Sequence, residues 1–140
     1  DIAIENYNWE VYQKEFDRTF RKSSNLDDIH ENGIHDYLKF IKFGYGRGTD
    51  HSNYDIRNGK MTRQEGIEMV KKYDHIKSSD LQRWLDYVGM TEKEFDSIAD
   101  SYRDQRVWSI KKDKWYKEDL SGEEVEYGDV YSFPSWYKEE

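Results

Sequence analysis

The stretch TRQEGIEMVKKYDHIKSSDLQRWLDYVGMTEKEFDSI, residues 62–98, holds three helix-start signals in close succession. Each signal is a Ser or Thr followed three residues later by Glu or Gln. In such a capping box the two side chains satisfy each other's free backbone N–H groups. The pairs are Thr62 with Glu65, Ser79 with Gln82, and Thr91 with Glu94. Apolar residues at helical spacing follow each box, so the stretch predicts three helices and a mainly α fold.

Three further helices are predicted on the N-terminal side of this stretch. Residues 33–44, GIHDYLKFIKFG, place apolar side chains on one face and end at Gly44, a favourable C-cap. Residues 8–20, NWEVYQKEFDRTF, also have the helical period. Their aromatic residues at that spacing are Trp9, Tyr12, Phe16 and Phe20. A shorter helix is predicted to open at Thr49 or Asp50 and to close at Gly59.

The pattern changes after residue 106. Residues 106–118 alternate apolar and polar side chains around Lys112-Asp113, which predicts a short β-hairpin. Residues 119–140 are acidic and aromatic, and we expect them to form an irregular, extended C-terminal arm. Aromatic residues in irregular sequence are candidates for contacts outside the core. They are Trp115, Tyr127, Tyr131, Trp136 and Tyr137. Residues 1–140 are thus expected to form a single small multi-helix domain.

Composition limits the classes of function. The 140-residue chain has 16% aromatic residues, which argues against disorder, and a net charge of −8, which disfavours nucleic-acid and anionic-membrane partners. It has no cysteine, and no apolar run approaches the length of a membrane span. Because it begins at Asp1 rather than methionine, we expect it to be a fragment of a larger protein.

The stretch FGYGRGTD, residues 43–50, concentrates glycines around an arginine. Glycines let a ligand approach backbone amides, a helix N-terminus favours anions, and arginine binds phosphate or carboxylate. Residues 44–74 carry more basic than acidic side chains, whereas residues 1–43 and 75–140 each carry more acidic than basic ones. The predicted anion-binding residues are Gly44, Tyr45, Gly46, Arg47, Gly48, Arg57 and Arg63. The predicted supporting residues are Thr49, Asp50, His51 and Asp55, which would orient the arginines or cap helices.

A simpler interpretation of the same stretch stays open. Gly44 could be only a C-cap, the other glycines could only let the chain reverse, and the charges could form structural ion pairs. The spacing is neither a dinucleotide-binding fingerprint nor a P-loop. Asp50 or His51 could act as a general base, and His30 with Asp36, or His51 with Asp55, could bind a metal. Surface histidines beside acids are common, so no metal site is predicted.

Residues 35–74, HDYLKFIKFGYGRGTDHSNYDIRNGKMTRQEGIEMVKKYD, resemble the C-terminal part of the bacterial N-acetyl sugar amidotransferase family. The resemblance continues through LQRWLDYVGMTEKEFDSIADSYRD to Trp108, and covers roughly residues 33–118. These enzymes serve lipopolysaccharide O-antigen and nonulosonate biosynthesis. The family's PP-loop signature, Ser-Gly-Gly-x-Asp-Ser, is absent here, as are its N-terminal cysteines. The chain therefore resembles the C-terminal portion alone and is expected to be inactive by itself.

The resemblance implies an ATP- and Mg²⁺-dependent reaction of the full-length enzyme. A PP-loop domain adenylates the acetamido oxygen of a nucleotide-linked N-acetyl sugar, and ammonia from a glutaminase subunit displaces AMP to leave an acetamidino group. It implies a cytoplasmic protein whose loop at residues 44–48 faces the PP-loop domain and holds substrate phosphates. Three hypotheses follow: a substrate-binding domain of this enzyme, a non-catalytic module for oligomerisation or partner docking, and a free-standing helical protein.

Overall fold

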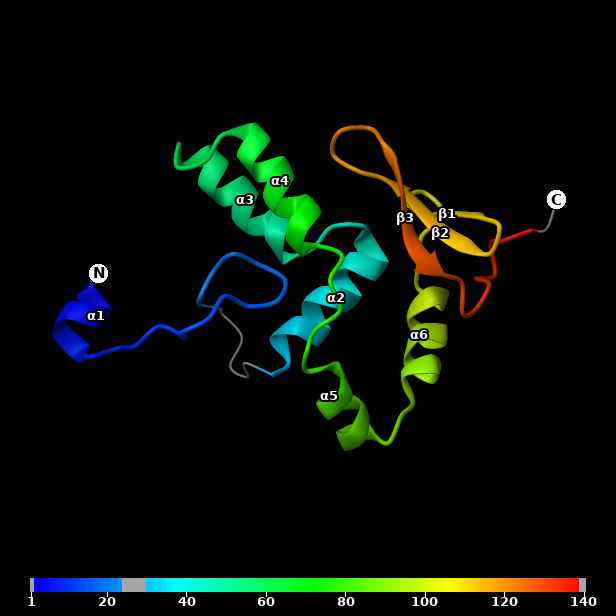
Figure 1. Ribbon diagram of the computed structural model, residues 1–140, viewed down its shortest axis with the longest axis horizontal. Coiled ribbons are helices and arrows are strands. Elements are labelled where there is room, and N and C mark those ends of the chain that lie inside the picture. Colours follow the sequence, from blue (N-terminus) through cyan, green and yellow to red (C-terminus); the bar gives the residue numbers. More distant parts are fainter. Residues whose placement is uncertain (1, 24–29, 139–140) are drawn as a thin grey trace.

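The computed structural model describes residues 2–23 and 30–138, in which six helices precede a small antiparallel sheet (Figure 1). The helices are α1 (Ile2–Tyr7), α2 (Asn32–Phe43), α3 (Arg47–Arg57), α4 (Arg63–Tyr73), α5 (Leu81–Val88) and α6 (Glu92–Ser101). The strands are β1 (Ser109–Lys111), β2 (Lys114–Glu118) and β3 (Glu124–Asp129). The mainly α prediction is confirmed. Within the described part of the chain, no helix has the length and apolar character needed to cross a membrane.

Two of the three predicted capping boxes are confirmed. Thr62 Oγ1 accepts from the Glu65 amide at the start of α4, and Thr91 does the same with Glu94 at α6. The box at Ser79 is wrong, because α5 begins one residue later, after Asp80, and has no side-chain cap. The Ser79 N–H instead donates to Asp17 Oδ2 at 2.7 Å, a contact that crosses 62 residues of sequence.

The helix predicted over residues 8–20 is also wrong. Helix α1 ends at Tyr7, and Asn8 takes a left-handed φ of 51°. The chain then forms a loop closed by backbone hydrogen bonds from Tyr12 to Lys22 (3.2 Å) and from Phe16 to Arg21 (3.1 Å). The aromatic spacing fitted a helix, but Tyr12 stacks on Phe16 whereas Phe20 packs against His51 and Tyr73. Tertiary contacts therefore outweigh the local pattern.

The predicted hairpin is present and gains a third strand. The turn at Lys112 and Asp113 has two left-handed residues, with φ of 50° and 58°. This conformation matches the twist of a two-residue hairpin. The strand order is β1-β2-β3, with Ile110 opposite Trp115 and Tyr116 opposite Glu126. The expected extended arm is thus incorrect for Glu124–Asp129, which pairs with β2.

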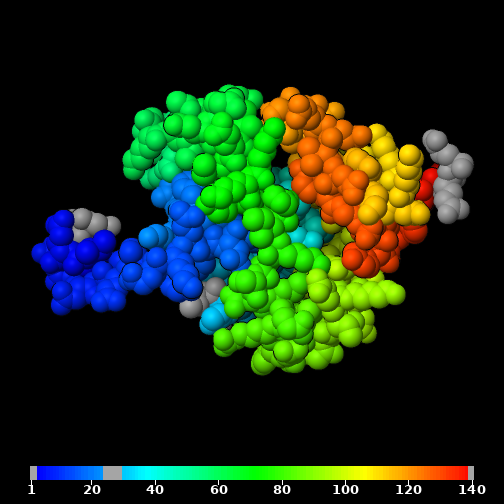
Figure 2. All heavy atoms as spheres, in the orientation of Figure 1, coloured from blue at the N-terminus to red at the C-terminus, as the bar shows by residue number. Residues whose placement is uncertain are grey.

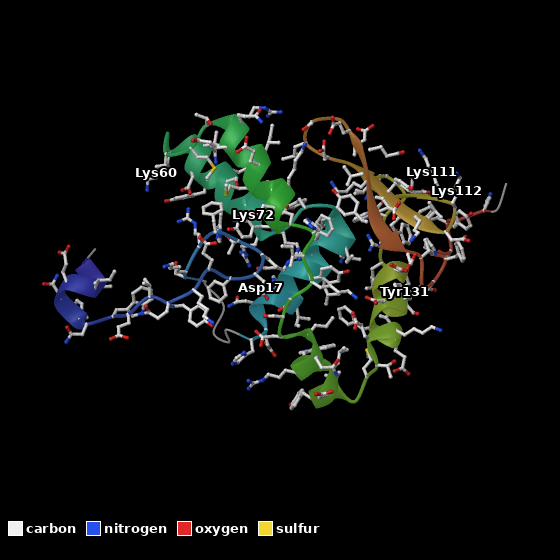
Figure 3. The ribbon with its side chains drawn as sticks, viewed as in Figure 1. Asp17, Lys60, Lys72, Lys111, Lys112 and Tyr131 are labelled. Carbon is white, nitrogen blue, oxygen red and sulfur yellow. The ribbon has the colours of Figure 1, made fainter. Side chains whose placement is uncertain are left out.

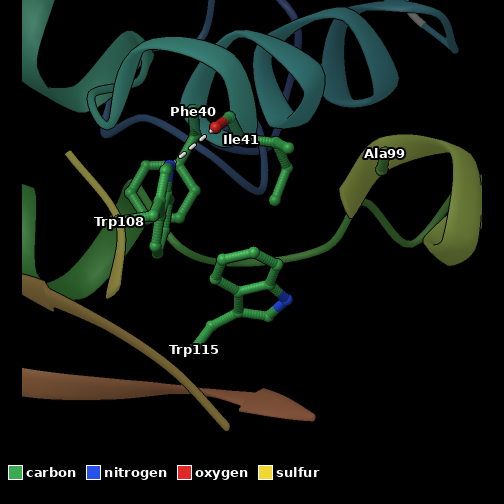
Figure 4. Close-up of a cluster of buried hydrophobic side chains, with 5 residues drawn as sticks. All are labelled: Phe40, Ile41, Ala99, Trp108 and Trp115. Carbon is green, nitrogen blue, oxygen red and sulfur yellow. Dashed lines mark hydrogen bonds between the residues drawn. The ribbon is translucent and has the colours of Figure 1, made fainter. Parts of the chain in front are cut away.

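Two apolar clusters form the core, and α2 contributes to both. One contains Ile34, Leu81, Leu85 and Phe95. The other contains Phe40, Ile41, Ala99, Trp108 and Trp115, and it joins α2 and α6 to the sheet (Figure 4). Trp108 Nε1 donates to the Ile41 carbonyl at 2.8 Å. Trp115, expected to make outside contacts, is fully buried instead.

A buried charge fixes the C-terminal tail to this core. The Arg103 guanidinium lies over the Trp108 ring at 4.0 Å and the Trp115 ring at 4.7 Å, and its Nε donates to Asp100 Oδ1 at 3.0 Å. The other Asp100 oxygen accepts from the Tyr131 amide at 2.7 Å. One ion pair therefore ties α6, the sheet and the residues after β3 together.

Candidate functional site

The glycine-arginine stretch is a three-residue connection between two helices. Gly44 ends α2 with a φ of 76°, and its N–H donates to the Phe40 carbonyl, which confirms the predicted C-cap. Helix α3 begins at Arg47 after the N-cap Gly46, earlier than the predicted start at Thr49 or Asp50. Arg47 and Gly48 are therefore helical residues, and only residues 44–46 form the loop.

An internal carboxylate occupies the N-terminus of α3. Asp74 accepts from the Gly46 amide at 2.7 Å, the Thr49 amide at 3.1 Å and Thr49 Oγ1 at 2.6 Å. A helix N-terminus favours negative charge, and here the chain supplies it from the end of α4. A Cβ on Gly48 would lie 2.6 Å from Asp74 Oδ1, so glycine is required there for this approach.

Arg18 completes this buried arrangement. Its guanidinium donates to the backbone carbonyls of Asp36, Asp74 and Ile76, and only 1% of the residue is exposed. Burial lowers the pKa of Arg18 to about 10, although the negative charges of Asp74 and Asp36 oppose that shift. Sequence reasoning missed Arg18 and Asp74, because each acts across dozens of residues and neither belongs to a local motif.

Ion pairs with other residues engage one predicted anion-binding residue, Arg47, and two of the predicted supporting residues, Asp50 and Asp55. Arg47 forms an ion pair with Asp36, Nη2 to Oδ1 at 2.9 Å, and its side chain is 16% exposed. Asp50 pairs with Lys39, and Asp55 with Arg21 at 2.7 Å. The supporting acids thus orient Lys39 and Arg21 rather than the predicted arginines.

His51 links α3 to the N-terminal loop. Its Nδ1 lies 2.5 Å from Thr19 Oγ1. Burial, together with the charges of Arg21 and Arg47, lowers the pKa of His51. Thr19 thus engages His51 while Asp55 pairs with Arg21, and His30 Nδ1 lies 3.0 Å from Asp80 Oδ1. Among residues 2–23 and 30–138, no three acidic or histidine side chains gather closely enough to hold a metal ion.

The structure does not bring Arg57 and Arg63 to the loop. They lie at the end of α3 and the start of α4, and both are exposed. Lys60 lies in the connection between α3 and α4, and its label in Figure 3 marks the outer end of these two helices. An eleven-residue helix is about 16 Å long, so this end lies roughly that distance from Gly46. Anion binding by these arginines stays a prediction.

A groove opens where the loop, the end of α4 and the sheet meet. We call it the helix–sheet groove; residues lining it include Tyr45, Lys71, His75, Lys117, Asp119 and Tyr127. It consists of two adjoining hollows that share Lys71, His75, Asp119 and Tyr127 in their walls. The narrow end, of about 50 Å³, borders Gly44 and Lys117, and the wide end, of about 430 Å³, borders β3. Sequence reasoning placed Gly44 and Tyr45 at a site, but the groove's residues from α4, β2 and β3 were not predicted.

Lys117 is the unusual charge in this groove. Its Nζ lies 5.9 Å from the Phe40 ring centre and 5.6 Å from that of Tyr127, and it donates to the Glu118 carbonyl at 2.8 Å. No carboxylate of the described residues forms an ion pair with it, whereas Lys71 pairs with Asp119 at 2.9 Å. Burial lowers the pKa of Lys117. An ammonium group so placed is suited to an incoming anion.

A family model for the C-terminal domain of WbpG-like lipopolysaccharide (LPS) biosynthesis proteins matches residues 4–120. The chain belongs to this family. The match covers the end of α1, all of α2 to α6 and the first two strands. It therefore includes the loop at residues 44–46, Lys71, His75 and Lys117, but not β3. A search of curated proteins finds no match to the chain.

Proposed function

We propose that this chain is the substrate-binding C-terminal domain of an ATP-dependent amidotransferase. The enzyme would convert the acetamido group of a nucleotide-linked N-acetyl sugar into an acetamidino group, with ammonia from a glutaminase subunit, in the cytoplasm. Membership of a WbpG-like LPS biosynthesis family supports a role in the biosynthesis of lipopolysaccharide sugars. The unpaired Lys117 ammonium in the helix–sheet groove is the observation that carries the binding role.

The groove suits the two chemical parts of a nucleotide sugar. At the narrow end, the Lys117 ammonium offers positive charge to a phosphate or carboxylate. At the wide end, the Tyr127 ring offers a stacking surface, and Glu123 and Glu126 can accept hydrogen bonds from sugar hydroxyls. The predicted contacts from Arg47, Arg57 and Arg63 stay part of the proposal.

ATP and Mg²⁺ belong to the preceding PP-loop domain in this proposal. The sequence lacks the Ser-Gly-Gly-x-Asp-Ser signature, and the described residues include no cluster of acids and histidines suited to a cation. These residues do not fit either group. The chain's own part is to bind and orient the sugar nucleotide.

Calorimetric titration of the full-length protein with UDP- and CMP-linked N-acetyl sugars tests the proposal. Lys117→Met should weaken binding by about 10- to 100-fold, because a hydrogen bond to a charged group contributes roughly 1.5–3 kcal/mol. The matched control is Lys114→Met on the same strand, whose side chain pairs with Asp129 at 2.5 Å. Equal affinities for the two variants would overturn the binding role.

Stability gives a second readout for the same variant. Because burial lowers the folded-state pKa of Lys117, the protonated amine favours the unfolded chain at neutral pH. Lys117→Met should therefore raise the thermal unfolding midpoint at pH 7, and this gain should shrink as the pH rises toward the ordinary lysine pKa. Weaker binding with higher stability is the pattern expected of a binding residue rather than of a packing residue.

The second candidate function, a docking or oligomerisation module, is favoured by a different observation. The N-terminal segment exposes large apolar side chains. Both functions can reside in one domain, because the groove and this segment involve different residues.

A further inference from the structure

The first residues of the chain form an arm that stands apart from the rest of the molecule. We call residues 2–15 the N-terminal arm; Figure 2 shows its outer part extending from one side of the body. Every residue from 4 to 15 is exposed. The large apolar side chains and their exposed fractions are Ile4 45%, Tyr7 78%, Trp9 49%, Val11 38% and Tyr12 43%.

The helix in the arm is too short to be stable in isolation. Helix α1 has six residues, whereas an isolated helix shorter than about 12–15 residues is marginal in water. The Trp9 N–H donates back to the Ala3 carbonyl at 3.3 Å, which only closes the end of the helix. Its large apolar side chains are only partly covered, and Tyr7 is 78% exposed. A surface of this kind marks a contact with another protein surface.

The base of the arm is fixed firmly, so its direction is set. Arg18 is buried among backbone carbonyls, and the Tyr73 hydroxyl donates to Glu15 Oε2 at 2.6 Å. Phe20 makes edge contacts with the rings of His51 and Tyr73, with centres 6.2 and 6.3 Å apart. The arm therefore projects from a rigid attachment and can hold a neighbouring surface in a defined orientation.

We propose that the N-terminal arm is the docking surface for the domain that precedes this one in the full-length protein. The family is defined as a C-terminal domain, and its match begins at residue 4. The exposed apolar side chains thus lie inside the shared domain, on the segment that connects it to what comes before. Residues 2–13 contain Glu5 and Glu10 and no Lys or Arg, so the complementary surface on the preceding domain is expected to be apolar with a basic rim.

This inference rests on the second candidate function, the docking module, and its test uses neither substrate nor activity. A photo-crosslinking amino acid is placed at Val11 in the full-length protein, and the products are mapped by mass spectrometry. The matched control position is Tyr87 on α5, which is 88% exposed and lies outside the arm. Crosslinks from position 11 to the preceding domain, within one chain and absent from position 87, are expected.

Amide exchange in the full-length protein supplies an independent readout. The arm should exchange at least about tenfold more slowly than in a variant carrying Tyr7→Ser, Trp9→Ser and Tyr12→Ser, while α6 exchanges equally in both. Crosslinks between two copies would overturn the proposal in favour of a dimer contact. An arm that exchanges freely, or that crosslinks only to its own domain, would also overturn it. Loss of sugar binding in Lys117→Met bears on the proposed function alone.

Discussion

At the scale of single residues, Asp74 should be among the most sensitive positions in the chain. It accepts three hydrogen bonds at the start of α3, and its negative charge faces the buried Arg18. Asp74→Ala removes a helix cap and leaves a buried guanidinium with less compensating charge. We expect the free energy of unfolding to fall by about 3–5 kcal/mol. Urea denaturation with unchanged m-values measures this loss.

The control for this prediction is Glu68→Ala, an exposed acid on the same helix. It should change stability by less than about 0.5 kcal/mol. Asp74→Asn keeps one acceptor and most of the shape, so its loss should be intermediate. A loss in Asp74→Ala no larger than that of the control would show that the loop does not depend on this carboxylate.

Residue-level prediction from sequence succeeded where the interaction is local. The C-cap at Gly44, the boxes at Thr62 and Thr91, and the turn at Lys112-Asp113 all depend on neighbours within a few positions. The role of Asp74 could not be predicted, because its partners at the start of α3 lie 25 and 28 residues away. Lys117 resembles any strand lysine until the fold places Phe40 beside it.

At the scale of secondary-structure elements, the capping boxes allow a sharp comparison. Thr62→Ala and Thr91→Ala should each lower the free energy of unfolding by about 1 kcal/mol, since each hydroxyl accepts from a backbone amide of its helix. Ser79→Ala should change it by less than about 0.5 kcal/mol, because α5 has no side-chain cap. Chemical denaturation of the three variants under one condition measures the difference. Equal losses would mean that Ser79 caps α5 after all.

The predictions of secondary structure failed where one sequence pattern is compatible with two different structures. Aromatic residues at positions 9, 12, 16 and 20 fit a helix, yet Tyr12 and Phe16 stack on each other at 5.4 Å while Phe20 packs elsewhere. Strand β3 has the sequence EVEYGD, in which apolar side chains are few and a glycine interrupts the pattern. Its pairing with β2 is decided by the neighbouring strand, so no local signal could reveal it.

At the scale of the whole molecule, the helices and the sheet are joined by contacts that span large parts of the sequence. Trp108 reaches the Ile41 carbonyl across 67 residues, and Trp136 Nε1 donates to the Arg103 carbonyl at 2.7 Å. The aromatic content argued for a folded chain, and aromatic rings make up half of the buried hydrophobic side chains. The composition could not predict which rings are buried, because assignment to the core depends on the tertiary arrangement rather than on spacing.

The closure of the N-terminal loop onto the helices should make the stability of the whole domain depend on pH. Burial and nearby arginines lower the folded-state pKa of His51, and partial burial lowers that of His75. The unfolded chain therefore binds more protons than the folded chain below the ordinary histidine pKa, and stability rises with pH in that range. Each histidine thus favours folding when it is neutral.

We therefore expect the thermal unfolding midpoint to fall as the pH drops from about 7 to 5, a range that lies above the ordinary pKa values of the carboxylates. His51→Asn, which can keep a polar contact to Thr19, should be somewhat less stable at pH 8 and should show a shallower fall. Adding His75→Asn should flatten the profile further. Calorimetric scans at half-unit pH steps separate loss of the Thr19 contact from loss of the histidine's protonation. The lost contact lowers the unfolding midpoint equally at every pH, whereas the lost protonation changes how steeply the midpoint falls with pH. An unchanged slope in His51→Asn would mean that protonation of this ring does not loosen the loop, and the acid sensitivity would then have to come from another group.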